Sequence, residues 1–257
     1  MILKKINFNS LLVLGIIPLI FSCASRKDVV YFQDASAFET IVSDNTHTNK
    51  FKVDDVVNIH ISTLDPLASV PFNLFKGSDE SGMRPQQVDY IIDKNGEIDF
   101  PVIGKIRLVG LSSEETKILL TEKLKDYLKD PIINIRIQNF TVTVLGEVNT
   151  PGTYPVNGEQ ITILEAIGLA NDLTIKGKRN NVMVIRDFNG TKVYTRLDLT
   201  KKEALSSPVF YLTQNDVVYV EPNNSAIKTS TLDNRASIYL SVFSLLVTST
   251  ILILRTN

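Results

Sequence analysis

Short runs in which apolar and polar residues alternate fill the middle of the chain, and they constrain its fold more than any other feature. Such alternation is typical of strands that bury one face. It occurs in VVNIHIS at 56–62 and again in IINIRI at 132–137. Asn-Gly pairs at 95–96 and 189–190 supply the positive φ angles that tight hairpin turns need. The middle of the chain is therefore predicted to consist largely of strands and hairpins.

Two helix starts are set among these strands. Ser112 with Glu115, and Thr162 with Glu165, have the spacing of a capping box, in which each side chain bonds the other residue's backbone N–H. An apolar face follows the first start until Pro131 ends the run, and ILEAIGLA follows the second. Because strands flank both helices, the sequence predicts an α+β fold made of two small mixed domains.

A similar six-residue sequence occurs in each of the two predicted domains. DDVVNI at 54–59 and NDVVYV at 215–220 each place an acidic turn before a strand. Asp side chains bond nearby backbone N–H groups in turns. Asp55 and Asp216 are therefore interpreted as turn residues and not as catalytic acids.

Composition and histidine content exclude several functions. The chain of 257 residues holds 27 Lys and Arg against 28 Asp and Glu, without a block of like charge. A nucleic-acid-binding surface needs a basic patch, so nucleic acid is not expected as a partner. His60 falls on the polar face of a predicted strand and His47 in a loop, whereas metal sites need several converging ligands. No metal and no cofactor are expected.

Enzyme chemistry also finds little support in the residues. Two histidines and one cysteine offer no nucleophile with a partner base, and no Gly-rich phosphate loop is present. The pairs at 54–55 and 114–115 could supply the two acids of glycoside hydrolysis. Adjacent acids at a strand entry or a helix start are more simply explained as turn and capping residues. The sequence therefore predicts a protein that is not an enzyme, and a periplasmic hydrolase is disfavoured.

The N-terminus has the features of a targeting segment. Lys4 and Lys5 precede an apolar stretch at 11–21 that is short for a spanning helix, and the only cysteine, Cys23, follows. The residues IFSC resemble the cleavage box of a bacterial lipoprotein, in which the cysteine becomes the mature N-terminus and is acylated. Residues 1–22 are thus predicted to be a signal peptide and Cys23 the lipidation site.

A second apolar segment ends the sequence. Residues 236–254 carry no charge and are bracketed by Arg235 and Arg255. In a helix they would span about 28 Å, close to the roughly 30 Å of a bilayer's hydrocarbon core, so the sequence predicts a transmembrane helix. Hydroxyl side chains recur on one face of this helix, as a pore lining or a contact between helices requires. The predicted stripe comprises Ser237, Ser241, Ser244, Thr248 and Arg255.

Three stretches of the sequence resemble known domains. They are FKVDDVVNIHI, then VDYIIDKNGEIDFPVIGKIRLVGLSSEET, then VTVLGEVNTPGTYPVNGEQITILEAIGLA. In this order they are similar to the polysaccharide export domain and the soluble-ligand-binding β-grasp (SLBB) domain of outer-membrane lipoproteins that export capsular and extracellular polysaccharide. The likeness covers residues 29–222, and CASRKDVVYFQDA resembles the start of Bacteroidetes-type members.

The resemblance implies an assembly and a function. Members form rings in which each subunit contributes a C-terminal helix to a pore, and an inner-membrane protein of the chain-length-determinant and tyrosine-kinase type accompanies them. The chain is thus expected to be a lipid-anchored subunit of a homo-oligomeric outer-membrane channel that carries polysaccharide from the periplasm, where most of the chain lies, to the surface. The alternative is a sugar-binding or scaffold periplasmic lipoprotein with a C-terminal membrane anchor.

Three turns depart from the family pattern. Asp54-Asp55 and Asn215-Asp216 stand where Gly-Asp is usual, and Ala170-Asn171-Asp172 stands where Ala-Gly-Gly is usual. Asn and Asp are the residues besides glycine that best tolerate left-handed backbone, so the turns at 54–55 and 215–216 are expected to survive. The substitution at 170–172 argues against a close backbone approach at that turn, but not against the fold. The predicted organisation is a signal peptide at 1–22, a lipidated segment at 23–50, an export domain at 51–139, an SLBB domain at 140–222, a linker at 223–235 and a transmembrane helix at 236–254.

Overall fold

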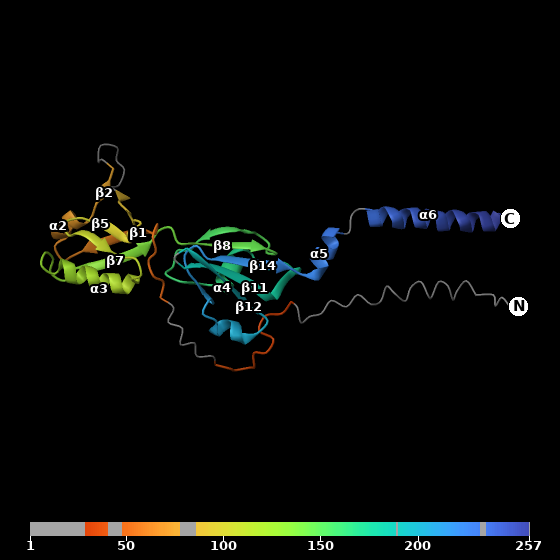
Figure 1. Ribbon diagram of the computed structural model, residues 1–257, viewed down its shortest axis with the longest axis horizontal. Coiled ribbons are helices and arrows are strands. Elements are labelled where there is room, and N and C mark those ends of the chain that lie inside the picture. The colour runs from red at the N-terminus through yellow and green to blue at the C-terminus, as the bar shows by residue number, and fades with distance from the viewer. Residues whose placement is uncertain (1–28, 41–47, 78–85, 189, 232–234, 257) are drawn as a thin grey trace.

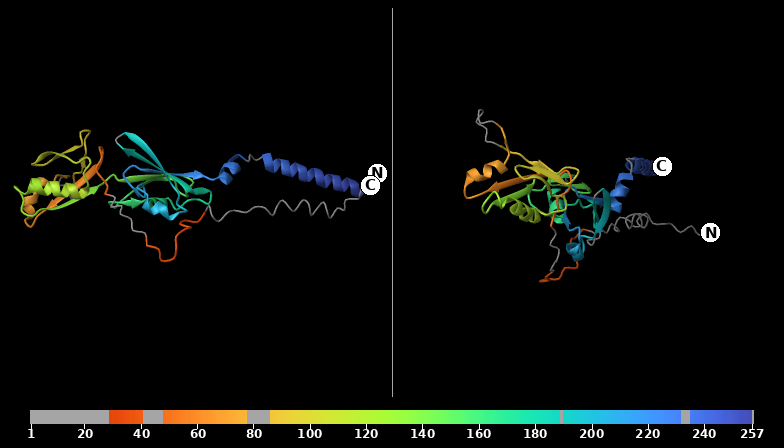
Figure 2. Two further views of the ribbon diagram at one scale, coloured as in Figure 1. Left: turned by 60° about the horizontal axis from the view of Figure 1, so that its bottom comes forward. Right: turned by 60° about the vertical axis from the view of Figure 1, so that its left-hand side comes forward.

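A computed structural model of the protein describes residues 29–40, 48–77, 86–188, 190–231 and 235–256. Two sheet-containing bodies and the C-terminal helices follow one another along the long axis of the molecule (Figures 1 and 2). The first domain extends from β1 to β7 and the second from β8 to β14. The C-terminal helices α5 (Asn224–Thr231) and α6 (Arg235–Thr256) continue beyond the second domain.

The first domain is built on a three-stranded antiparallel sheet with the order β4-β1-β7. Strand β1 (Val56–Ser62) lies between the short β4 (Tyr90–Ile91) and the edge strand β7 (Ile132–Ile137), and helix α3 (Ser113–Leu124) packs on β7. The smaller elements are α2 (Pro66–Ser69), η3 (Val70–Phe72), β2 (Phe75–Lys76) paired with β3 (Gln86–Gln87), and β5 (Glu97–Phe100) paired with β6 (Gly104–Arg107).

Alternating apolar residues form the core of the first domain, as the strand patterns predict. Ile59 and Ile61 of β1 and Ile135 of β7 are buried, and Leu120 and Leu124 of α3 cover them. His60 points the other way and is exposed. The period of two in the sequence thus corresponds to one buried and one exposed sheet face.

The turn at Asn95-Gly96 forms, but it does not join a hairpin of two paired strands. Gly96 has a φ of 81°, and the backbone N–H of Asp93 donates to the carbonyl of Glu97 at 2.9 Å. The strands on either side of this turn pair elsewhere, because β4 joins β1 and β5 joins β6. The hairpin predicted at this position is therefore wrong in its pairing.

The second domain holds a five-stranded sheet with the order β12-β11-β14-β8-β9. Only the β14 and β8 pair is parallel within it. The Asn189-Gly190 hairpin is confirmed, because β11 and β12 pair from Phe188 opposite Thr191. The elements are β8 (Thr141–Gly146), β9 (Gly152–Pro155), β10 (Ile161–Thr162), α4 (Ile163–Leu169), β11 (Gly177–Phe188), β12 (Thr191–Leu197), η5 (Lys202–Ser206), β13 (Tyr211–Leu212) and β14 (Val217–Pro222).

Both predicted capping boxes are present. The Ser112 hydroxyl accepts from the Glu115 N–H at 3.1 Å, and the Glu115 carboxylate accepts from the Ser112 N–H at 2.8 Å. Thr162 and Glu165 make the same exchange at the start of α4. These boxes form because each is a contact between residues three apart, which short-range geometry decides.

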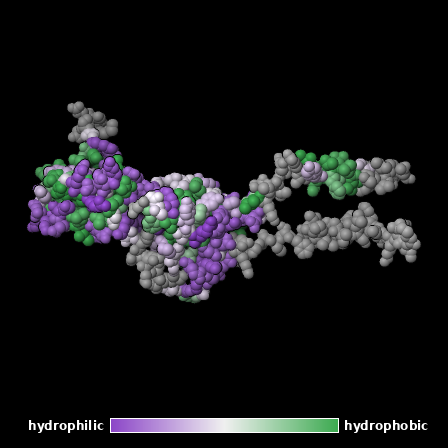
Figure 3. All heavy atoms as spheres, in the orientation of Figure 1, coloured by the Kyte–Doolittle hydropathy of each residue, from purple (hydrophilic) through white to green (hydrophobic). Residues whose placement is uncertain are grey.

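The prediction of a C-terminal transmembrane helix is contradicted. In the portion of the chain that the structure describes, no helix is both long enough and apolar enough to cross a membrane. The apolar run that indicated a membrane helix lies in α6, whose described side chains are those of residues 238–249. Serine and threonine also interrupt this apolar stretch, which appears as a green band with a pale patch in Figure 3.

Candidate functional site

The two turns with similar sequences, at 54–55 and 215–216, have the same geometry. Asp54 and Asn215 both adopt left-handed backbone, with φ of 69° and 65°. The next residue in each case is a buried aspartate that accepts from a backbone N–H three residues earlier. Lys52 N donates to Asp55 at 2.8 Å, and Thr213 N donates to Asp216 at 2.8 Å. The interpretation of both acids as turn residues is therefore confirmed.

The two aspartates differ in their partners. Arg186, which is 5% exposed, donates from Nε and Nη2 to the Asp216 carboxylate at 2.7 to 3.1 Å. The Thr213 hydroxyl adds a bond at 3.0 Å, and Arg186 also donates to the Tyr211 carbonyl. Asp55 lacks a guanidinium partner in the described residues, and burial raises its pKa to about 6 despite the N–H donated by Lys52. One turn thus holds a carboxylate paired with a buried guanidinium, and the other a buried carboxylate for which the charge of Lys52 only partly offsets the effect of burial.

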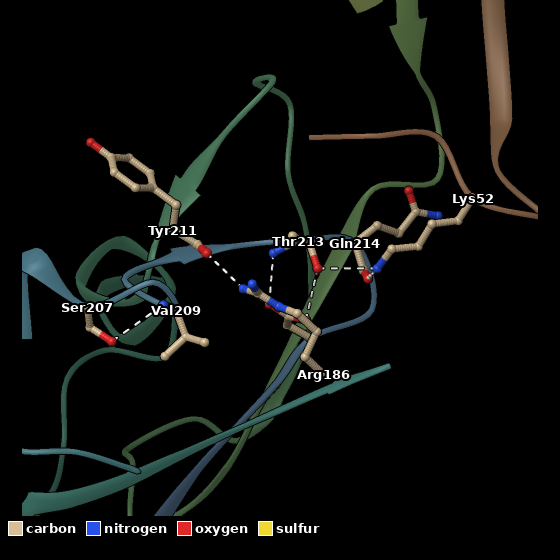
Figure 4. Close-up of polar contacts among 8 residues, drawn as sticks. Lys52, Arg186, Ser207, Val209, Tyr211, Thr213 and Gln214 are labelled. Carbon is tan, nitrogen blue, oxygen red and sulfur yellow. Dashed lines mark hydrogen bonds and ion pairs between the residues drawn. The ribbon is translucent and has the colours of Figure 1, made fainter. Parts of the chain in front are cut away.

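Lys52 connects the first domain to the second domain's turn. Its ammonium donates to the Thr213 hydroxyl and to the Gln214 carbonyl, each at 3.2 Å (Figure 4). Burial lowers the pKa of Lys52, and the negative charge of Asp216 opposes that shift. The link therefore places a cation from one domain beside the buried ion pair of the other.

Two asparagines add further contacts at the junction. Asn139 lies between the domains in sequence and bonds both the Val56 N–H, at 2.9 Å, and the Asp54 carbonyl, at 3.0 Å. Asn49 donates to the Glu159 carbonyl at 2.6 Å across the junction. Lys52 and Asn49 thus join the domains by hydrogen bonds of fixed direction, which define their relative orientation, whereas Asn139 fixes the end of the first domain beside the start of β1.

A cleft with a volume of 710 Å³ lies at this junction. One side is formed by β7 and the start of α3, and the other by residues 155–160 of the second domain. This volume is in the range of about 300 to 1,000 Å³ that is usual for ligand sites. Asn49 forms part of the wall, and its Oδ1 is buried without a partner in the part of the molecule that is described. Residue spacing does not predict this cleft, because its sides are far apart in sequence.

The Asn171-Asp172 departure leaves the turn intact. Both residues adopt left-handed backbone, with φ of 56° and 69°. Asp172 accepts from the Tyr31 hydroxyl at 2.5 Å, and the Tyr31 ring lies 5.2 Å from the Arg179 guanidinium. Side chains at this turn therefore also hold the N-terminal segment against the second domain.

The predicted functional residues are not brought to the junction. Cys23 and the predicted signal peptide lie outside the described residues. Ser241, Ser244 and Thr248 share one side of α6 with Leu240 and Leu245, as the spacing predicts, and the Thr248 hydroxyl donates to the Ser244 carbonyl. Ser237 and Arg255 fall within α6, outside its described side chains. No cluster of potential metal ligands occurs among the described residues, and whether the stripe has a function stays a prediction.

Comparison with known families identifies the class of both domains. Residues 43–138 match the family described as polysaccharide biosynthesis/export protein, and residues 141–220 match the SLBB domain. The chain therefore contains an export domain followed by an SLBB domain, which confirms the resemblance predicted from the sequence motifs.

Two related proteins carry a more specific name. The chain is 25% identical over 146 residues to the EPS I polysaccharide export outer membrane protein EpsA of Ralstonia solanacearum, a match that covers 55% of this chain and 38% of that protein. The protein of the same name from Ralstonia nicotianae is 26% identical over 145 residues, covering 54% of this chain and 37% of that protein. The matches therefore span well under half the length of these relatives.

Proposed function

We propose that the protein takes part in exporting an extracellular or capsular polysaccharide across the outer membrane, without enzymatic activity of its own. The observation that carries this proposal is the pair of consecutive domain matches, export then SLBB, over 43–138 and 141–220. The names of the two relatives support both the transported polymer and the outer-membrane location. The lipidated Cys23 would attach the chain there, with the two domains in the periplasm.

The geometry of the junction fits a role in conducting a polymer. Lys52 and Asn49 hold the two domains in one orientation by directed hydrogen bonds. A conduit built from several copies needs such fixed orientation, because each copy must present the same surfaces to its neighbours. An inner-membrane protein of the chain-length-determinant and tyrosine-kinase type is the proposed partner on the periplasmic side.

Self-association into a ring is the proposed assembly. Apolar side chains of α6 are exposed, with Leu240 at 76% and Leu245 at 72%, and exposed patches of this kind mark interaction surfaces. We expect Ser241, Ser244 and Thr248 to lie where neighbouring helices approach, since small residues permit close packing. Mass photometry of the full chain extracted in detergent should show a single large oligomer, whereas a monomer would contradict this assembly.

The export role is tested in cells that lack the gene. We expect polymer to disappear from the surface of these cells while it is still made, and expression of the wild-type chain to restore it. An empty vector is the control. Normal amounts of surface polysaccharide in the deletion strain would contradict the proposal.

A further inference from the structure

The floor of the junction cleft is the free edge of a sheet. Strand β7 pairs only with β1 in the described structure, so its other edge is unpaired. Gln138 N donates to the Val56 carbonyl at 2.7 Å, which orients Gln138 toward β1. Because backbone groups alternate in direction along an antiparallel strand, the N–H and C=O groups of Ile133, Ile135 and Ile137 point into the cleft. All three residues line it.

Polar side chains surround this edge. Asn134 and Arg136 of β7 are exposed and line the cleft, and neither side chain has a hydrogen bond or ion pair within the described ranges. Asn157 on the opposite side is likewise exposed there without a partner in those ranges. Pro155 and Val156 add apolar surface beside these groups. The cleft thus offers donors and acceptors on both sides, with a small apolar area between them.

The charges of the cleft point to an uncharged ligand. Its charged residues are two acids and two bases, and Lys117 already pairs with Glu114 at 3.4 Å. Arg136 and Glu159 remain, so their opposite charges leave no excess that would select an anion or a cation. Alternating backbone donors and acceptors suit hydroxyl groups, because each hydroxyl both donates and accepts.

We infer that this cleft binds a short, uncharged, hydroxyl-rich segment of polysaccharide along β7, with Arg136 and Asn134 as its principal side-chain contacts. The inference rests on the proposed export function, and it adds a specific contact site and a ligand charge class. Binding is expected to be weak, because a polymer in transit must enter the site and also leave it.

The test is saturation-transfer difference NMR on the full chain in detergent, with maltoheptaose as the neutral probe and trigalacturonate as the acidic one. Maltoheptaose should bind with a dissociation constant near the millimolar range. Arg136→Ala should weaken it by about tenfold, as expected for losing a hydrogen bond from a charged donor. Asn134→Ala should weaken binding to a smaller extent. Unchanged thermal unfolding of both variants would show that the fold persists.

Arg107→Ala is the matched control, because Arg107 is also an exposed strand arginine but lies outside the cleft. It should leave the affinity for maltoheptaose unchanged. The inference would be overturned by absent binding, by equal losses in Arg107→Ala and Arg136→Ala, or by binding of trigalacturonate alone. It would also be overturned if hydrogen exchange found Ile133, Ile135 and Ile137 protected in the unliganded oligomer, since a strand of a second copy would then occupy the edge. Normal export with any of these results would leave the proposed function standing.

Discussion

Asp216→Ala should lower the free energy of unfolding of the SLBB domain by about 3 to 5 kcal/mol. The substitution removes the carboxylate that accepts from Arg186 and Thr213 and leaves the guanidinium buried with only the Tyr211 carbonyl. An uncompensated buried charge costs far more than a lost surface contact. A loss of this size is a large share of the roughly 5 to 15 kcal/mol that stabilises a typical domain. Urea denaturation followed by circular dichroism measures it.

The matched control is Arg196→Ala, which breaks the Arg196 and Glu221 ion pair in the same sheet. Nη1 of Arg196 lies 2.6 Å from Oε1 of Glu221, but the arginine side chain is 53% exposed. Its removal should cost less than about 1 kcal/mol. Replacing both partners, as Arg186→Met with Asp216→Leu, should recover much of the stability, because no buried charge is then left alone. Equal effects of Asp216→Ala and Arg196→Ala would contradict this account of the turn.

Asp55→Asn should change how stability depends on pH in the export domain. Burial raises the pKa of Asp55 from 3.8 to about 6 in the folded protein. The folded state therefore holds this proton more tightly than the unfolded chain does, so the stabilisation is full below pH 3.8 and is lost as the pH rises through 6. The loss amounts to at most about 3 kcal/mol. The Asn variant keeps an acceptor for Lys52 N but has no proton to release, so it should lack this decline.

Unfolding of both proteins across the same pH series measures the effect. Asp54→Asn is the control, because Asn also tolerates the left-handed backbone at that position and Asp55 keeps its burial. The control should keep most of the decline, because burial is the largest cause of the raised pKa of Asp55 and the charge of Asp54 is a smaller one. Parallel curves for wild type and Asp55→Asn would mean that another group produces the pH dependence.

Local contacts explain why much of the fold is predictable from sequence. The capping boxes are contacts between residues three apart, Ser112 with Glu115 and Thr162 with Glu165. The alternating burial of β1 likewise follows from its own sequence, because one face of the strand packs on the core. Which strands pair with each other is harder to predict from local sequence. The turn at 95–96 was recognisable, but β4 pairs with β1, more than thirty residues earlier. The apolar run near the C-terminus indicated a membrane helix, which the described residues contradict.

The site was less predictable than the fold, because distant residues build it. Lys52 meets Thr213 across 161 positions, and Asn49 meets Glu159 across 110. The sequence similarity around Asp55 and Asp216 did identify both turns. It did not predict Arg186, whose bonds to Asp216 make the two turns different. Neither the cleft nor the free edge of β7 leaves a local sequence signal. The domain resemblance gave the functional class, and the structure was needed to locate where a ligand could bind.

Pulse-labelling after rapid depletion of the protein tests the central claim most directly. Newly made polysaccharide is labelled shortly after depletion, and a membrane-impermeant probe measures the fraction that reaches the surface. If the protein serves export, total labelled polymer stays at the wild-type amount while its surface fraction falls toward zero. If total polymer falls and the surface fraction stays unchanged, the protein serves biosynthesis and the account is contradicted.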